Sequence, residues 1–285
     1  MNPLVPDFEN VCFRSGKGAL AIPAFEGELT LCRVLGVLKM LVSSSDEQMM
    51  PVLAMDGCWE PHVTTALWAI IQPGMYVVNV GAHVGYYALL AGMLVGPKGI
   101  VRAFEPNPAL SDILGSNIRM NNLDGRVIAP QRAVGTVPEG QLTLQATLRH
   151  TSCRPGEGSL VCDPWHEGNN LVCQSVSVVS IGPDSGRVRP DLVICDAEGS
   201  EPDVFASMRP WATPTSQGPI FVCDWDPVMF PDTCGKRAQE ILDAGYKVSL
   251  IDGRGDLTTL PAEAFLGLKS QAHLVCDRQP GGPVK

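Results

Sequence analysis

The chain has 285 residues, 45% of them hydrophobic and 18% charged, so it can bury a large core in one or two domains. Its 30 acidic residues outnumber 21 basic ones, for a formal net charge of -9, which disfavours a nucleic-acid partner because such a surface repels phosphates. None of the ten cysteines forms a Cys-x-x-Cys pair, no secretory signal opens the chain, and no apolar run could span a bilayer. We therefore expect buried thiols, a cytoplasmic location and no membrane partner.

The N-terminal part is expected to form a small cap. Alternating polarity over residues 19–23 is followed by helical spacing over residues 29–40. A second helical pattern over residues 61–71 stops at a Pro-Gly pair. We expect this helix to pack on a central sheet and to bring Trp59 and Glu60 to the rim of a cofactor pocket.

A glycine turn between two apolar strands is the most informative segment. A β-branched run over residues 76–80 ends in Gly81-Ala82-His83-Val84-Gly85 and leads into an apolar helical pattern. The two glycines lack a Cβ, so the backbone can turn tightly and approach a ligand to which the helix N-terminus also points. The next strand, over residues 100–104, leads to Glu105, whose carboxylate can accept hydrogen bonds from both hydroxyls of a ribose. This order predicts a nucleotide-cofactor site.

The cofactor is expected to carry a ribose but no pyrophosphate. The turn lacks the middle glycine of the dinucleotide fingerprint, and the side chain of His83 would crowd a pyrophosphate. S-adenosylmethionine is therefore favoured, and His83 either contacts its methionine part or caps the following helix. The candidate cofactor-binding residues are Glu60, Asn79, Gly81, Ala82, His83, Gly85, Tyr86, Glu105, Asn107 and Asp196.

Strands and helices alternate from Tyr76 onward. Strands are predicted over 76–80, 100–104, 126–129, 191–196, 219–224, 246–251 and 271–276, and helices over 85–95, 108–121, 200–208 and 235–244. This alternation predicts an α/β fold with a mostly parallel sheet, an antiparallel last strand and helices on both faces. We assign residues 1–72 to the cap and its helix, and residues 73–285 to a catalytic domain. Residues 135–182, rich in Gly, Pro and Ser, are expected to be a substrate-facing insertion.

A second motif follows a buried apolar run that ends at Asp196. Because the carboxyl ends of parallel strands form the ligand crevice of an open sheet, Asp196 and Glu198 are expected to face the same pocket as the glycine turn. Ser200 is a candidate N-cap of the next helix, and Glu201 and Asp203 are expected to interact with its N-terminus.

With these motifs the chain resembles the FkbM family of methyltransferases over about residues 57–251. The resemblance implies a Rossmann-like sheet of seven strands and S-adenosylmethionine-dependent methyl transfer to a hydroxyl oxygen, commonly of a sugar or specialised metabolite. The segments that carry it are Gly57-Cys58-Trp59-Glu60-Pro61, Asn79-Val80-Gly81-Ala82-His83-Val84-Gly85-Tyr86-Tyr87, Ala103-Phe104-Glu105-Pro106-Asn107-Pro108, Asn121-Asn122 and Asp196-Ala197-Glu198-Gly199-Ser200-Glu201.

Three residues depart from the family pattern. Relatives usually carry Asp at the position of Asn79, Asn at that of His83, and Lys at that of Ile194, two positions before Asp196. If that Lys assists catalysis in relatives, another group replaces it in this chain.

Several groups are candidates for removing the proton of the acceptor hydroxyl. Asp196 is the first, Glu198 the second, and His166 in the insertion the third. Asp196 and Asp224 end neighbouring strands and form a candidate pair for a hard divalent cation, although strand-end carboxylates also occur without metals.

Two other functions stay open at this point. An NAD(P)-dependent oxidoreductase or epimerase would use the same kind of fold, but none of the four tyrosines has a Lys four positions later as a proton-transfer partner. A non-catalytic cofactor-binding protein is the other alternative, since Ile194 replaces the family Lys. The expected partner is a small-molecule hydroxyl acceptor, and the sequence leaves the oligomeric state open.

Overall fold

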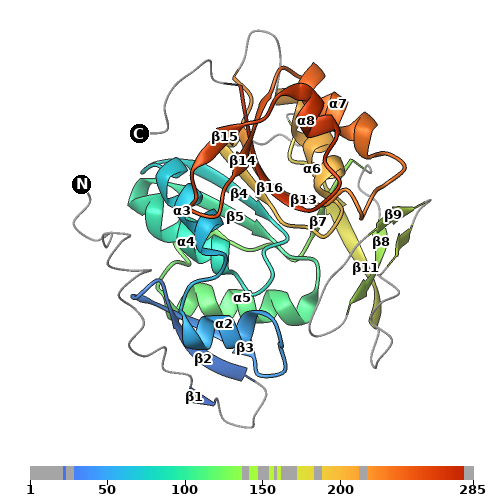
Figure 1. Ribbon diagram of the computed structural model, residues 1–285. Coiled ribbons are helices and arrows are strands. Elements are labelled where there is room, and N and C mark those ends of the chain that lie inside the picture. Colours follow the sequence, from blue (N-terminus) through green and yellow to red (C-terminus); the bar gives the residue numbers. More distant parts are fainter. Residues whose placement is uncertain are drawn as a thin grey trace.

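A central eight-stranded sheet organises the protein (Figure 1). The computed structural model describes residues 22–23, 29–136, 141–146, 154–156, 159–161, 172–182, 188–211 and 217–278. In spatial order the strands are β15 (Leu257–Thr259), β14 (Lys247–Ile251), β16 (Ala272–Asp277), β13 (Ile220–Trp225), β12 (Leu192–Cys195), β4 (Tyr76–Val80), β5 (Ile100–Phe104) and β6 (Val127–Ile128).

The predicted Rossmann-like α/β fold is confirmed. Strands β13, β12, β4, β5 and β6 pair in parallel, whereas β16 is antiparallel to both β13 and β14. The seven predicted strands all form, within one or two residues of their expected ends. The eighth, β15, is a three-residue edge strand antiparallel to β14 that the sequence did not predict.

Helices cover both faces of the sheet, as predicted (Figure 1). Helices α3 (Pro61–Ile70), α4 (Tyr86–Leu94) and α5 (Pro108–Met120) contribute to one hydrophobic cluster. Helices α6 (Glu201–Met208), α7 (Cys234–Asp243) and α8 (Ala262–Leu266) contribute to the other. Helix α7 illustrates how a helix buries one side against the sheet. Its three buried residues are spaced by four and three positions and therefore lie on one side of the helix: Cys234, Ala238 and Ile241. Short 3₁₀ turns follow α4 (Gly96–Lys98) and α6 (Arg209–Trp211).

The helix predicted over residues 29–40 is wrong. The segment forms the antiparallel strands β2 (Leu29–Val34) and β3 (Leu38–Ser43), with β1 (Ile22–Pro23) beside β2 and α2 (Met49–Met55) following. Burial alternates along both strands, and the turn between them has Gly36 at φ 69°. A short apolar run fits both periods, and here the left-handed turn settles it as a hairpin.

Asn117 of α5 and Asn121, which caps the C-terminus of this helix, attach the hairpin to the central sheet and its helices. Asn117 accepts a hydrogen bond from the backbone N–H of Leu41 at 2.7 Å and donates to its carbonyl at 2.9 Å. Asn121 does the same with Lys39, at 2.9 and 2.6 Å. The two side chains, one helical turn apart, thus act as backbone partners for the edge of β3. Asn117 also donates to the carbonyl of Val84 in the glycine turn, at 2.8 Å, which links the hairpin to the candidate site.

Part of the expected insertion forms strands. Strand β11 (Val172–Val179) pairs with β7 (Ala133–Val134) and β8 (Gln141–Ala146), and β9 (Arg154–Gly156) pairs with β10 (Ser159–Val161). Strands β8, β9 and β11 extend to one side of the central sheet in Figure 1. His166, the third candidate base, lies outside the described residues.

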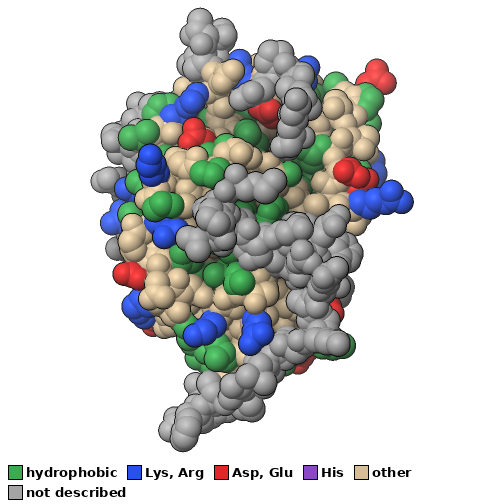
Figure 2. All heavy atoms as spheres, turned by 90° about the vertical axis from the view of Figure 1, so that its left-hand side faces the viewer, with side chains coloured by type: hydrophobic (Ala, Val, Ile, Leu, Met, Phe, Trp, Pro, Cys, Tyr) green, Lys and Arg blue, Asp and Glu red, His purple; other side chains and the backbone are tan. Residues whose placement is uncertain are grey.

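On the face shown in Figure 2, apolar and basic side chains of the described residues are interspersed. No helix in the described parts of the chain is long and apolar enough to cross a membrane. Within the described residues, six cysteines are buried free thiols, as expected: Cys32, Cys58, Cys195, Cys223, Cys234 and Cys276.

Candidate active site

The strand register brings the candidate residues into one row. Asn79 on β4 pairs with Ala103 on β5 and with Ile194 on β12, and Ile194 pairs with Val222 on β13, which pairs with Val275 on β16. The next residues on the same face lie two positions further toward the ligand edge, because side chains alternate along a strand. That row consists of Glu105, Gly81, Asp196, Asp224 and His273.

Hydrogen bonds continue the ladder into this row. The N–H of Gly81 donates to the carbonyl of Phe104 at 3.0 Å, and that of Asp196 to the carbonyl of Val80 at 3.1 Å. Asp224 and His273 are direct register partners, since β16 starts at the edge where β13 ends. The predicted convergence of the glycine turn, Glu105 and Asp196 thus follows from the pairing itself.

The two glycines of the turn are required by packing within the protein. Gly81 has φ 71°, and a Cβ there would lie 1.8 Å from the carbonyl oxygen of Asp196. Gly85 has φ 106° at the N-cap of α4, and its Cβ would lie 2.6 Å from Cδ1 of Leu114. Close approach of the β12 edge and of α5 therefore explains these residues without invoking a ligand.

Glu105 is held from both sides by backbone donors. Its Oε2 accepts the N–H of His83 at 2.8 Å, and its Oε1 accepts that of Asn107 at 2.8 Å. The residue is 2% exposed, and burial raises its pKa to about 7 although the two N–H groups act in the opposite direction. Asn107 in turn caps α5, because its Oδ1 accepts the N–H of Ala109 at 3.0 Å.

The remaining residues of the glycine segment differ in surroundings. Asn79 is fully buried, and neither its Oδ1 nor its Nδ2 has a hydrogen-bond partner among the described residues. Ala82 is buried and donates its N–H to Phe104. Tyr86 points toward α3, where its hydroxyl contacts Thr64 Oγ1 at 3.1 Å and donates to Cys58 Sγ at 3.4 Å. His83 has φ 51°, and α4 has Gly85 at its N-cap without a side-chain cap bond.

The loop after β12 concentrates carboxyl groups. Burial, and then the charges of Glu198 and Asp224, raise the pKa of Asp196 well above its ordinary value. Glu198 is exposed and has φ 49°, a left-handed conformation that non-glycine residues rarely adopt. Glu201 accepts the N–H groups of Ala197 at 2.8 Å and Gly199 at 2.9 Å, so it fixes this loop, and burial raises its pKa to about 8.

The two residues expected near the start of α6 have other contacts. Ser200 occupies the N-cap position of α6 but makes no side-chain cap bond. Asp203 forms an ion pair with Arg237 of α7 at 3.2 Å.

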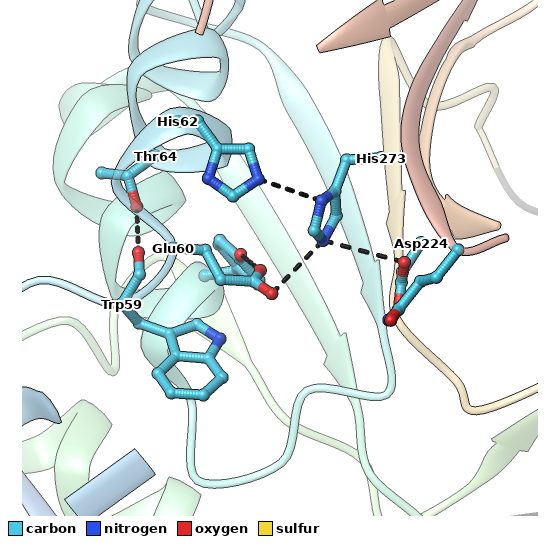
Figure 3. A network of polar contacts seen from close by, with 8 residues as sticks. Trp59, Glu60, His62, Thr64, Asp224 and His273 are labelled. Atoms are coloured by element: carbon cyan, nitrogen blue, oxygen red, sulfur yellow. Dashed lines mark hydrogen bonds and ion pairs between the residues drawn. The ribbon is translucent and has the colours of Figure 1, made fainter. Parts of the chain in front are cut away.

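A polar network at the end of the row contains residues that the sequence did not single out. His273 Nε2 lies 3.2 Å from Glu60 Oε1 and 3.7 Å from Asp224 Oδ1, and its Nδ1 lies 3.0 Å from His62 Nε2 (Figure 3). The Tyr87 hydroxyl donates to the other oxygen of Glu60. A histidine at the start of the last strand was the available signal, because an antiparallel strand begins at the edge where its parallel neighbours end.

Glu60 itself has an unusual backbone. It precedes α3 with φ 41° and ψ 72°. Such left-handed conformations of non-glycine residues cluster at functional sites. In the described parts of the chain, no group of three or more His, Cys, Asp or Glu side chains is arranged to hold a metal ion.

Comparison with known sequences finds one family. The profile of the methyltransferase FkbM domain matches residues 79–248. Among curated proteins no sequence matches this chain.

Several solved structures are similar in their chain trace. A Pyrococcus horikoshii TYW2 in complex with MeSAdo has 14% identity and a TM-score of 0.45, covering 88% of this chain and 70% of its own. A precorrin-6y C5,15-methyltransferase from Geobacter metallireducens has 13% identity, a TM-score of 0.42 and coverages of 76% and 87%. A SAM-dependent O-methyltransferase from Thermotoga maritima has 11% identity, a TM-score of 0.42 and coverages of 94% and 88%. At these scores the similarities carry no argument about function.

Proposed function

The chain belongs to the FkbM methyltransferase family, and on that premise we propose that it transfers the methyl group of S-adenosylmethionine to a hydroxyl of a sugar or specialised metabolite. The observation that carries this proposal is the row Glu105, Gly81, Asp196, Asp224 and His273 along one edge of the sheet. Neighbouring strands are roughly 4.8 Å apart, so the row extends over roughly 19 Å. A cofactor at one end and an acceptor at the other fit this length.

The residues near Gly81 suit an adenosyl cofactor. The ionised carboxylate of Glu105 has lone pairs beyond those used by His83 and Asn107, which allows it to accept the ribose hydroxyls. The buried amide of Asn79 has unused donor and acceptor atoms one row below, which suits a bridging water. Glu60 lies near His273 at the end of the row, and its carboxylate would attract a cationic amine or sulfonium.

We propose that Asp196 is the residue that orients and deprotonates the acceptor hydroxyl. The cofactor supplies a methyl group on a positively charged sulfur, and in this neighbourhood a positive charge favours the ionised form of Asp196. Asp196 then orients the hydroxyl and takes its proton while the new O–C bond forms and the C–S bond breaks, with the electron pair of that bond remaining on sulfur. Correct orientation of a reacting pair is worth roughly 7–11 kcal/mol of barrier reduction. Glu198 is the alternative proton acceptor.

Two competing functions make different predictions. An NAD(P)-dependent enzyme would bind a dinucleotide across the glycine turn. Membership of the FkbM family favours a methyltransferase over this alternative. A non-catalytic protein would bind the cofactor and transfer nothing. Isothermal titration calorimetry can measure the affinity for S-adenosylmethionine, S-adenosylhomocysteine and NAD. Binding of NAD would indicate the NAD(P)-dependent enzyme, and binding of the other two compounds the methyltransferase.

Methyl transfer is tested with cofactor that carries a deuterated methyl group. The protein is incubated with this cofactor and a small-metabolite extract, and mass spectrometry identifies compounds that gain the label only when protein is present. A labelled methyl ether on a hydroxyl is the expected product. Cofactor binding without any labelled product would support the non-catalytic alternative, and label on nitrogen or carbon would contradict O-methylation.

A further inference from the structure

The network around His273 lies outside the segment that matches the family profile, apart from Asp224 and Tyr87. His273 comes from the last strand, and Glu60 and His62 come from the start of α3. His62 and His273 are therefore features that the family profile does not describe, whereas Glu60 belongs to one of the segments that carry the family resemblance. Nevertheless, His273 lies at the end of the row that contains Asp196.

The carboxylates of Glu60 and Asp224 are held in matching ways. One oxygen of each accepts a neutral donor: Glu60 Oε2 from the Tyr87 hydroxyl, and Asp224 Oδ2 from Gln271 Nε2 at 2.5 Å. The other oxygen of each lies within ion-pair distance of His273 Nε2, at 3.2 and 3.7 Å, without a hydrogen bond to it. Figure 3 shows the imidazole between the two acids. A single imidazole, which carries a positive charge only when protonated, therefore lies between two carboxylates from different elements.

The other side of the ring fixes the protonation pattern. A doubly protonated His273 donates from Nδ1, so His62 Nε2 is the acceptor and His62 is neutral. The pKa shifts agree with this assignment. Burial lowers the pKa of His273. The contact with Glu60 and the charge of Asp224 outweigh the effect of burial and raise this pKa above 6.5. For His62, burial and the charge of His273 lower the pKa, against Glu60 and Asp252.

Both clamped acids act on Asp196. After burial and Glu198, the charges of Asp224 and Glu60 are among the causes that raise its pKa, which makes its ionised form a stronger base. Without a cation between them, Glu60 and Asp224 would repel one another and would each find more stable positions in water. Two acids kept charged and close together at the end of the row need a fixed counter-charge.

We propose that His273 is a positioning residue that clamps Glu60 and Asp224 beside Asp196, so that activation of the acceptor hydroxyl requires a protonated His273. This inference rests on the proposed function, because Asp196 is the group through which His273 acts. Among the described residues, the titratable groups that face the network are Glu60, Tyr87, Asp224 and His62, with Asp252 near His62, Asp226 near Asp224, and Asp196 near Glu60 and Asp224.

The first test needs no acceptor. Nuclear magnetic resonance of ¹⁵N-histidine-labelled protein measures both pKa values. His273 is expected to titrate above 6.5 and His62 below it. Glu60→Gln and Asp224→Asn should each lower the value of His273, and His273→Gln should raise that of His62. Asp277→Asn, the same chemical change at the far end of β16, is the matched control and should move neither.

The second test measures turnover against pH with the deuterated cofactor and the metabolite extract. The turnover rate of the wild type should rise with pH as Asp196 ionises. It should then fall as the pH increases through the pKa of His273. His273→Gln keeps a donor but no titratable charge, so it should lose the alkaline fall and turn over about 10- to 100-fold more slowly at the optimum. Circular dichroism and methylthioadenosine binding check that the variant is folded.

The outcomes separate the inference from the function it rests on. A wild type that labels no metabolite overturns the proposed function and this inference with it. A wild type that labels a hydroxyl while His273→Gln keeps the alkaline fall overturns the inference alone. Equal pKa values for the two histidines, or values unmoved by Glu60→Gln and Asp224→Asn, would also overturn it.

Discussion

The protonation of Glu105 should control binding of the adenosine part of the cofactor. Burial raises the pKa of Glu105 to about 7 from an ordinary 4.5, so at pH 6 the free protein carries a mostly neutral carboxyl there. Accepting hydrogen bonds from two ribose hydroxyls requires the ionised form. Binding below the pKa therefore includes the cost of removing a proton, and affinity falls by up to about tenfold for each pH unit.

The magnitude follows from this single ionisation. With a pKa of about 7, lowering the pH from 7.5 to 5.5 should weaken binding roughly 25-fold. Methylthioadenosine is the suitable probe, because it has the ribose and sulfur of the cofactor but no amino-acid charges. Isothermal titration calorimetry between pH 5.5 and 8.5 measures the dissociation constant directly.

Removing the charge should remove this pH dependence. Glu105→Gln is expected to bind methylthioadenosine roughly 10- to 150-fold more weakly at pH 8, which corresponds to roughly 1.5–3 kcal/mol for hydrogen bonds to a charged group. Glu263→Gln on the exposed side of α8 is the matched control and should behave as the wild type. The variant must first be shown to be folded by circular dichroism, since Glu105 also satisfies two backbone N–H groups. Wild-type affinity that stays constant down to pH 5.5, or an equal slope in Glu105→Gln, would refute the reasoning.

Three further changes test other parts of the site. Asp196→Asn should leave affinity for S-adenosylhomocysteine nearly intact and lower turnover about 10²-fold or more; near-normal turnover would shift the role to Glu198, and loss of wild-type turnover with a chelator would indicate a metal ligand instead. Shortening residues 135–182 should reduce acceptor turnover more than cofactor affinity, and a shortened protein that methylates normally would exclude a substrate-facing role. Asn79→Asp should lower the free energy of unfolding by roughly 3–5 kcal/mol, and adding Ile194→Lys should restore much of it; additive losses in denaturant titrations would contradict the pairing.

The sequence predicted the sheet well because its central strands are buried on both faces. Such strands read as continuous apolar runs, and glycines or carboxylates mark where they end. The hairpin of β2 and β3 was missed because its short apolar segments also fit a helical period; the left-handed turn at Gly36 and the tertiary contacts with Asn117 and Asn121 favour the hairpin.

The candidate site was predicted where a residue directly follows a parallel strand, as Glu105 and Asp196 do. His273 and His62 were missed because their meeting depends on the direction of the last strand and on how α3 packs. Their separation of 211 positions in the sequence gives no local pattern. The tight turn predicted at Gly81 is present, and the neighbour that excludes a Cβ there, which the sequence did not reveal, is the backbone of Asp196.

The departures from the family pattern at Asn79 and Ile194 lie side by side on neighbouring strands. The register pairs these two residues on adjacent strands and on the same face, and both are buried. In relatives that carry Asp and Lys there, the same register would place a carboxylate beside an amine about 4.8 Å away along the sheet. Losing only one of them would leave an unpaired buried charge, which costs several kcal/mol, whereas losing both leaves an amide beside an apolar side chain. We therefore expect the loss of the Lys to be offset within its own row, and we propose that the acceptor reacts at the next row, where Asp196 and Asp224 lie with His273.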